Sequence, residues 1–400
     1  MLAIVNGRLI LPDERAGGHF EAISGLALLI EDGRIKDVMP EVRLRADYSS
    51  CPVWDAGGRF VSPGFINIHI HGCFGADTMD KDSEAIKTMC QKLPVHGVTS
   101  FLPTTITASM EDIQEALGRV REFMKNPWLA CGAEVLGANM EGPFISPDYR
   151  GCHQVKHVLP PDFSYVEPYA DVVKYVTVAS EELGGDYSFI EKCRNAGIIV
   201  SLGHSGAIYE EALDAIQHGM THATHLYNAM SPVHHREPGV TGAVLDAEGV
   251  IAELITDDVH CHPAAQRLAY RLKGENLVLI TDSCRACGLG DGVSELGGQQ
   301  VFVEGGLATL ADGTIAASVA SMDMVVRNFA HNTGLSLPRT VELATRVPAR
   351  ELGCLDQRGT LEPGRLANIA VFDSDVNIYA TFVRGQICYG QCINQHALML

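Results

Sequence analysis

The stretch Pro63-Gly64-Phe65-Ile66-Asn67-Ile68-His69-Ile70-His71-Gly72 joins an apolar strand pattern to two histidines. A nearly continuous apolar run of this kind is typical of a parallel strand that is covered on both faces. His69 and His71 are two residues apart, so both side chains leave the strand on the same face. Such a pair can bind one divalent cation, although two hydrogen-bonded core histidines would show the same pattern.

Similar apolar runs follow this first one, and helical stretches separate them. The expected strands are Phe65–His71, Val98–Thr105, Glu134–Glu141, Val173–Ala179, Ile198–His204, His222–Tyr227, Val250–Asp257 and Leu277–Asp282. Gly97, Gly197 and Gly219 stand just before three of them, where glycine commonly ends a helix. Strand–helix units in this rhythm predict a parallel (β/α)₈ TIM barrel. A doubly wound sheet is the structural alternative, but no glycine-rich dinucleotide or phosphate loop follows a strand.

Both ends of the chain have β-strand patterns instead. Near the N-terminus Ala3–Leu11 and Leu26–Ile30 are apolar, and the dipeptides Asn6-Gly7 and Asp32-Gly33 favour tight hairpin turns. The apolar segments near the C-terminus are Asn368–Phe372, Thr381–Val383 and Gln386–Cys388, with a turn at Arg384-Gly385. Gln299–Leu310 predicts one further hairpin, late in the barrel region.

The composition is that of a folded acidic protein. The chain has 400 residues, 46% of them hydrophobic, and a formal net charge of −19. This charge repels nucleic acid and anionic membranes, so we expect neither as a partner, and a phosphate site would need local positive groups. The N-terminus lacks a secretory pattern, so we expect a cytoplasmic protein with reduced cysteines. Cys284 and Cys287 form a single C-x-x-C, which we interpret as two ordinary thiols.

Side chains that can bind a metal stand at the C-terminal ends of five of the eight expected strands. They are His69 and His71 on the first strand, Glu141 on the third, His204 on the fifth, His225 on the sixth and Asp282 on the eighth. In a barrel these ends converge on one mouth, where active sites form. Imidazole nitrogens suit Zn²⁺ or Fe²⁺. The pattern therefore predicts a metal-dependent active site.

Taken alone, each of these residues also has a structural interpretation. Glu141 could form a salt bridge, because a buried carboxylate needs a partner. Asp282 could cap a helix, but in an active site it could accept a proton from water and return it to a leaving amine. His222 precedes His225 on the same expected strand, and we favour a packing or supporting role for it over direct ligation.

The chain resembles the N-acetylglucosamine-6-phosphate deacetylase family of the amidohydrolase superfamily over nearly its whole length. The segment from Pro63 to His71 marks the superfamily in general. Glu141-Gly142-Pro143-Phe144 and Thr224-His225-Leu226-Tyr227-Asn228-Ala229-Met230 are more specific to the deacetylases, and Gly203-His204-Ser205 matches as well.

The resemblance implies a distorted TIM barrel at residues 61–359, with a hairpin insertion near 299–311, and a small β-sandwich domain at 1–60 and 360–400. It implies one or two divalent cations per chain, Zn or Fe. Glu141, His204 and His225 would hold the first, and His69 and His71 a second that is bridged through Glu141. A homodimer is also implied, in which an arginine reaches across to the phosphate of the substrate.

The implied reaction is hydrolysis of N-acetyl-D-glucosamine 6-phosphate to D-glucosamine 6-phosphate and acetate, in amino-sugar catabolism. By the same resemblance Asp282 is the catalytic base and then the acid, and His153 polarises the acetyl carbonyl or holds a sugar hydroxyl. The other residues expected at the substrate are Cys152, Asn228, Ala229, Arg236, His260, Ile315, Ala316 and Ala317.

The chain departs from the usual family pattern at Asp258, Ser283 and Ala317, which we expect near the sugar. N-acetylgalactosamine 6-phosphate is therefore an alternative substrate, and Arg285 is a candidate for an extra anion contact. A non-catalytic scaffold with the same fold is a third alternative. Such relatives usually lose ligands or the base, whereas this chain keeps all of them.

Overall fold

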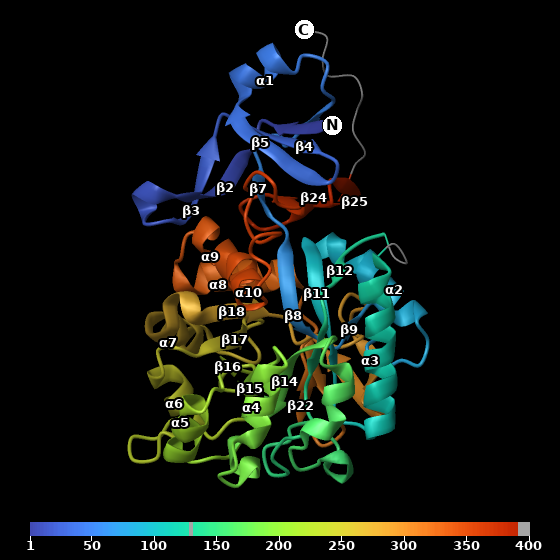
Figure 1. The fold of residues 1–400 in the computed structure, drawn as a ribbon, viewed down its shortest axis with the longest axis vertical. Helices are drawn as coiled ribbons and strands as arrows, with labels where there is room; N and C mark the ends of the chain where they lie inside the picture. Colours follow the sequence, from blue (N-terminus) through green and yellow to red (C-terminus); the bar gives the residue numbers. More distant parts are fainter. Residues whose placement is uncertain (128–130, 391–400) are drawn as a thin grey trace.

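A computed structural model describes residues 1–127 and 131–390. The chain forms a parallel barrel that carries a smaller β-sandwich at the top of Figure 1. The short strand β12 (Glu134–Val135) pairs with the barrel strand β11 (Val98–Thr105). The barrel strands, in order, are β8 (Phe65–Ile70), β11 (Val98–Thr105), β13 (Ala138–Met140), β14 (Val173–Val178), β15 (Ile199–Leu202), β16 (His222–Ala223), β17 (Ile251–Ile255) and β18 (Leu277–Ile280). The predicted distorted TIM barrel is confirmed.

The barrel closes just beyond the C-terminal ends of its first and last strands. The Asp282 N–H donates to the His69 carbonyl over 3.0 Å, and the N–H groups of His71 and Gly72 both donate to the Ser283 carbonyl over 2.9 Å. Gly72 lies so close to the neighbouring chain that a Cβ there would be 2.2 Å from the Ala76 oxygen. This closure places Asp282 beside the two histidines of the first strand.

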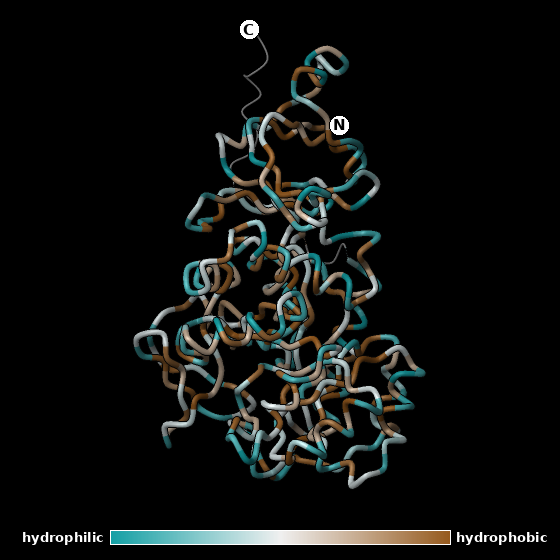
Figure 2. The backbone as a smooth tube through the Cα atoms, turned by 90° about the vertical axis from the view of Figure 1, so that its left-hand side faces the viewer, coloured by the Kyte–Doolittle hydropathy of each residue, from teal (hydrophilic) through white to brown (hydrophobic). Residues whose placement is uncertain are grey.

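Helices cover the outside of the barrel and bury apolar faces against its strands. They are α2 (Glu84–Lys92), α3 (Met110–Lys125), α4 (Ser188–Asn195), α5 (Tyr209–Gln217), α6 (Gly239–Asp246), α7 (Pro263–Lys273), α8 (Met322–Thr333), α9 (Leu337–Ala344) and α10 (Arg346–Glu351). In Figure 2 hydrophilic stretches are frequent along the outer loops. Among the described residues, no helix is long and apolar enough to cross a membrane.

Several barrel strands end earlier than the sequence predicted. Strand β16 contains only His222 and Ala223, although the expected strand continued to Tyr227. The backbone angle φ is positive at His204 (47°), His225 (29°) and Asp282 (50°). Because this left-handed conformation cannot continue a strand, the backbone leaves the sheet where these polar residues stand.

The two chain ends form the predicted β-sandwich. One sheet has the order β5 (Arg34–Pro40), β4 (Leu26–Glu31), β1 (Leu2–Val5) and β6 (Val53–Asp55), and the helix α1 (Glu41–Asp47) follows β5. The other sheet has the order β25 (Gln386–Gly390), β24 (Ile378–Val383), β23 (Ile369–Phe372), β7 (Phe60–Pro63), β2 (Arg8–Asp13) and β3 (His19–Ser24). Residues 391–400, which the expected small domain includes, lie outside the described residues.

Two of the three turns expected in this sandwich are hairpins, and the third is not. Asp32-Gly33 joins β4 to β5, and Arg384-Gly385 joins β24 to β25, as hairpin turns. The hairpin predicted at Asn6-Gly7 is wrong, because β1 pairs with β4 and β6 whereas β2 pairs with β3 and β7. The two strands bury their apolar sides in different sheets, so Asn6-Gly7 carries the chain from one sheet to the other.

An inserted antiparallel sheet lies near the mouth of the barrel. It contains β19 (Gly292–Leu296), β20 (Gln299–Glu304), β21 (Leu307–Thr309) and β22 (Ile315–Ala317). The hairpin expected at Gln299–Leu310 corresponds to β20 and β21, the middle strands of this sheet. Buried side chains of the sheet pack against Ile106, Cys152 and Cys284, so the insertion forms part of the wall around the mouth.

Candidate active site

The polar residues that the sequence placed at separate strand ends meet around the carboxylate of Glu141. Its Oε1 lies 2.9 Å from His225 Nε2 and 3.1 Å from His204 Nε2, and its Oε2 lies 3.0 Å from His71 Nε2. Glu141 follows β13 and is buried. One carboxylate therefore contacts histidines from three different strand ends.

Asp282 completes the cluster from the last barrel strand. Its Oδ1 lies 3.2 Å from His71 Nε2 and 3.4 Å from His69 Nε2. His69 Nε2 is in turn 3.6 Å from Glu141 Oε1. Nitrogen and oxygen atoms of His69, His71, Glu141 and Asp282 all lie within 4.8 Å of one another, which is close enough for a single cation to contact all four.

The protonation of the histidine rings fits a bound cation. His204 Nδ1 donates to the Tyr149 carbonyl over 2.9 Å, and His225 Nδ1 donates to the Asn228 carbonyl over 3.1 Å. In a neutral ring the Nε2 atoms then carry lone pairs, yet they lie 3.1 Å from each other and face Glu141. His69 Nε2 is buried and has no hydrogen-bond partner. Lone pairs and carboxylate oxygens that converge in this way repel one another, and a divalent cation bound among them would remove this repulsion.

The charges in the cluster shift the ionisation of its members. Burial alone would raise the pKa of Glu141, but His69 and the histidines that contact its carboxylate hold it well below the usual range. Burial alone would lower the pKa of His71, but Asp282 and Glu141 raise it to about 9. Without a cation the ring of His71 therefore carries a proton at neutral pH, and metal binding must displace it.

His153 lies beside the cluster, and its pKa is shifted in the opposite direction to that of His71. Burial and the neighbouring His204 lower the pKa of His153 to about 4, so its ring is neutral at physiological pH. Its Nε2 is 3.5 Å from Glu141 Oε2, and its Nδ1 is 2.6 Å from the Thr107 hydroxyl oxygen. A neutral imidazole in this position can act as a hydrogen-bond donor without bringing a positive charge to the metal ligands.

A cavity of about 330 Å³ opens above these residues at the mouth of the barrel. It is lined by His71, Glu141, Gly151, Cys152, His153, His204, His225, Asn228, Ala229, His260, Asp282, Thr314, Ile315 and Ala316. His260 is held there by its own loop, because its Nδ1 donates to Asp257 Oδ2 over 2.7 Å. Most residues that the sequence predicted for metal and substrate thus surround one cavity.

Four of the expected residues do not line this cavity. His69 belongs to the cluster but is fully buried, and Ala317 is also buried. Arg236 is exposed on the loop before α6, where its guanidinium contacts the neighbouring His235. Arg285 also lies elsewhere, because Asp80 Oδ1 (2.8 Å) and Glu295 Oε2 (3.3 Å) hold its guanidinium.

The sequence interpretation missed two residues that support the cluster. Thr107 contacts His153, and Glu253 lies 2.8 Å from His69 Nδ1. Glu253 did have a signal in the sequence, because a carboxylate in the middle of the apolar run Ile251-Ala252-Glu253-Leu254-Ile255 must have a buried partner. Thr107 had no such signal, since a threonine after an apolar strand is unremarkable.

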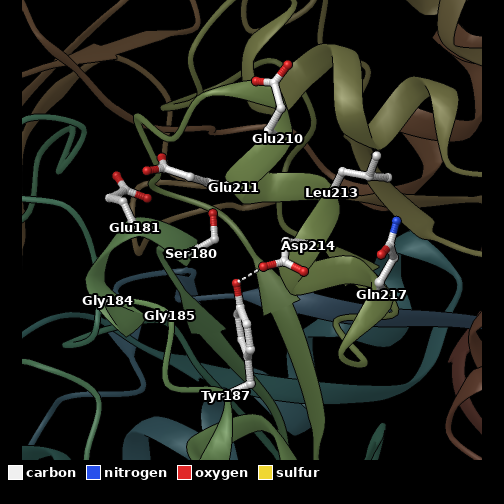
Figure 3. Close-up of a pocket in the computed structure, with 10 residues that line it drawn as sticks. All are labelled: Ser180, Glu181, Gly184, Gly185, Tyr187, Glu210, Glu211, Leu213, Asp214 and Gln217. Atoms are coloured by element: carbon white, nitrogen blue, oxygen red, sulfur yellow. Dashed lines mark hydrogen bonds between the residues drawn. The ribbon is translucent and has the colours of Figure 1, made fainter.

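A larger pocket of about 580 Å³ lies on the outer surface, between α5 and the segment before α4. Figure 3 shows its acidic side chains, with the hydroxyl of Tyr187 donating a hydrogen bond to the carboxylate of Asp214. Glu181, Glu210 and Glu211 add three carboxylates, and none of the residues that line the pocket is basic. A phosphorylated ligand would be repelled here, so the smaller cavity at the barrel mouth is the candidate active site.

Comparisons with known proteins agree with this geometry. The sequence model of the amidohydrolase family matches residues 60–388. N-acetylglucosamine-6-phosphate deacetylase of Bacillus subtilis (strain 168) is 40% identical over 387 residues, which make up 95% of this chain and 97% of the relative.

Solved structures give the same result. N-acetylglucosamine-6-phosphate deacetylase from Pasteurella multocida has a TM-score of 0.89 at 29% identity, covering 96% of this chain and 99% of that one. A mutant of the Mycobacterium smegmatis deacetylase in complex with N-acetyl-D-glucosamine-6-phosphate has a TM-score of 0.86 at 29% identity, covering 97% and 98%. The chain therefore belongs to the amidohydrolase family and, within it, to the N-acetylglucosamine-6-phosphate deacetylases.

Proposed function

We propose that this chain is a metal-dependent hydrolase that converts N-acetyl-D-glucosamine 6-phosphate and water to D-glucosamine 6-phosphate and acetate. The observation that carries the proposal is the convergence of Glu141, His204, His225 and Asp282 on one cavity. The Bacillus subtilis relative, named for this activity, matches nearly the whole chain.

Glu141, His204 and His225 would hold one divalent cation, and His69 and His71 would hold a second that shares Glu141. Zn²⁺ and Fe²⁺ suit this set of imidazole and carboxylate ligands. Such a cation supplies Lewis-acid polarisation of the amide and activation of a water molecule when it is bound.

Asp282 performs the proton transfers in this proposal. Burial alone would raise the pKa of Asp282, but His69 and His71 lower it, so the carboxylate is ionised at neutral pH and can accept a proton. It takes a proton from the attacking water and later gives it to the amine, as the bond between the amide carbon and nitrogen breaks. His153 donates from Nε2 to the acetyl oxygen, where negative charge develops.

The sugar phosphate would extend from the cluster along the wall of the cavity. Asn228 and Ala229 would contact the phosphate, partly through backbone N–H groups, and His260 would contact the sugar or its phosphate. Cys152, Ile315, Ala316 and Ala317 would shape the sugar pocket. Binding of the phosphate, remote from the amide, would position the reacting bond.

Arg236 suits a phosphate contact in a homodimer. Its loop is exposed and carries His234, His235 and Arg236 together, which is a concentration of positive groups in an acidic chain. Arg236 would reach the cavity of a second copy, where its forked donors suit a phosphate. Analytical ultracentrifugation should then show a dimer, and mixing Arg236→Ala chains with Asp282→Asn chains should restore part of the activity. A fully active monomer would contradict this arrangement.

We propose a cytoplasmic location, which fits the free thiols of the described cysteines.

The decisive experiment measures metal content and acetate release on the same preparation. N-acetylglucosamine 6-phosphate, N-acetylgalactosamine 6-phosphate and unphosphorylated N-acetylglucosamine are supplied separately. We expect turnover to require both the cation and the 6-phosphate. Equal activity on the unphosphorylated sugar would refute the phosphate assignment. Faster turnover of N-acetylgalactosamine 6-phosphate would make that compound the substrate in place of N-acetylglucosamine 6-phosphate.

A further inference from the structure

Glu253 is a buried carboxylate that contacts two members of the histidine cluster without facing the cavity. It lies in the middle of β17, and its side chain is 1% exposed. Its Oε2 lies 2.8 Å from His69 Nδ1 and accepts a hydrogen bond of 3.0 Å from the backbone N–H of His225. One oxygen atom therefore touches the ring of one proposed ligand and the backbone of another.

The contact with His69 determines which nitrogen of that ring faces the cavity. A carboxylate oxygen can only accept, so His69 Nδ1 carries the proton of this hydrogen bond. In the neutral ring Nε2 then presents a lone pair toward Glu141 and Asp282, and it has no other partner. The opposite tautomer would direct an N–H group at the cation.

The contact with His225 holds the backbone where β16 has just ended. His225 has a φ of 29°, which non-glycine residues rarely adopt. The Glu253 carboxylate accepts a hydrogen bond from the His225 N–H. The N–H of the next residue, Leu226, donates to the backbone carbonyl of Glu253 over 2.9 Å. Glu253 thereby fixes the direction in which the His225 ring leaves the barrel.

Glu253 is itself anchored from the opposite side. Its Oε1 lies 3.3 Å from His222 Nε2, and His222 Nδ1 donates to Glu351 Oε1 over 2.7 Å. The hydroxyl of Tyr175 donates to the other oxygen of Glu351 over 2.9 Å. Glu253, His222, Glu351 and Tyr175 thus form a buried row from β17, β16, α10 and β14, in which Glu253 meets His222 as a close ion pair and not as an aligned hydrogen bond.

We propose that Glu253 is a positioning residue of the metal centre, which sets the tautomer of His69 and the backbone of His225 through one carboxylate oxygen. The inference rests on the proposed function, because it requires that these histidines hold a cation. Outer partners of metal-binding histidines commonly change metal affinity by about 10- to 100-fold when they are removed.

The first test compares metal binding by Glu253→Leu, Glu253→Gln and the wild-type protein. Metal-depleted protein is dialysed against a series of buffered free Zn²⁺ concentrations, and bound zinc is counted. Leucine cannot accept either hydrogen bond, so we expect the dissociation constant to rise by about 10- to 100-fold. Glutamine keeps an acceptor oxygen of the same reach, and we expect it to retain most of the affinity.

Glu134→Leu is the matched control, because Glu134 is another buried glutamate of a short barrel-sheet strand. Arg358 and Arg384 pair with it, and it contacts none of the clustered histidines. We expect its zinc affinity to equal that of the wild type at temperatures where it is folded. A folded Glu253→Leu protein with wild-type zinc affinity would overturn the inference.

A second test needs no variant that could fail to fold. Long-range ¹H–¹⁵N spectra of zinc-loaded wild-type protein with labelled histidines report which ring nitrogen carries a proton. We expect His69 to be protonated at Nδ1 and metal-bound at Nε2, and the reverse assignment would overturn the inference. If the wild-type chain neither binds zinc nor releases acetate, the proposed function fails, whereas wild-type affinity in Glu253→Leu removes only the role of Glu253.

Discussion

The hydroxyl oxygen of Thr107 lies 2.6 Å from Nδ1 of His153, and the backbone N–H of Thr107 also points at this nitrogen over 3.3 Å. A backbone N–H can only donate, so Nδ1 acts as the acceptor and the ring proton is on Nε2, which faces the cavity. Thr107 thus supports the donor role that we propose for His153.

Replacing Thr107 by Val should reduce kcat by about 3- to 10-fold, because the ring loses one hydrogen bond worth about 1 kcal/mol while the backbone N–H still favours the reactive tautomer. Metal content should not change, since Thr107 contacts none of the proposed ligands. Steady-state kinetics with zinc-loaded protein measures the effect. Thr107→Ser keeps the hydroxyl and should keep most of the activity; a serine variant as slow as the valine variant would argue for packing instead.

Replacing Asp282 by Asn should lower kcat by about 10²- to 10⁴-fold, because the amide cannot accept a proton from water. The substitution keeps the size of the side chain, and Glu141, His204 and His225 remain to hold a cation. Acetate release and bound zinc, measured on the same sample, separate the two effects. Unchanged turnover would refute the role of Asp282 as base, and loss of zinc would show that it is mainly a ligand.

His222 should make stability depend on pH between about 6.5 and 9. Burial alone would lower the pKa of His222, but Glu351 and Glu253 raise it to about 9. Because the folded pKa lies above the unfolded one, the stabilisation is fully present below about 6.5 and is lost as the pH rises through 9. Thermal melts of zinc-loaded protein across this range should show a falling Tm.

The matched variant for this pH dependence is Glu351→Gln. It removes one of the two carboxylates that raise the pKa of His222, so its Tm should fall less steeply over the same pH range. Identical slopes in the two proteins would assign the pH dependence to other groups.

Gly72→Ala should destabilise the barrel closure, whereas Gly118→Ala should not. A Cβ on Gly72 would lie 2.2 Å from the Ala76 oxygen and 2.9 Å from the Arg285 nitrogen, and both are backbone atoms. Gly118 lies within the helix α3, where a Cβ would meet nothing within 4 Å, and alanine there should stabilise by about 0.5–1 kcal/mol. Chemical unfolding measures both changes, and equal free energies of unfolding for the two variants would contradict the steric argument.

The sequence predicted the barrel and most of the cluster because both depend on local patterns. The spacing of His69 and His71 on one strand determines that both side chains point the same way. The common direction of parallel strands determines that Glu141, His204 and Asp282 meet at one mouth. The ends of the strands could not be predicted, since nothing in the residue pattern of His222–Tyr227 indicates that the backbone turns at His225, where φ is positive.

Contacts that cross the barrel could not be predicted from the sequence for a different reason. His69 and Glu253 are partners from the first and seventh barrel strands, and no spacing along the chain connects them. Thr107 and His153 meet across the mouth from two loops. The turn at Asn6-Gly7 was misread because its local preference is the same whether the flanking strands pair with each other or with different neighbours.

The pairing of β7 with β23 has a consequence for synthesis on the ribosome. Val61 pairs with Val371, and Phe60 pairs with Phe372, so strands from opposite ends of the chain share one sheet. During synthesis of the barrel, Phe60 and Val61 can pair with β2 but lack the partners that β23 supplies on the other side. We expect the nascent chain to need protection by chaperones until translation is nearly complete, and C-terminal truncation should yield aggregates rather than a shortened enzyme.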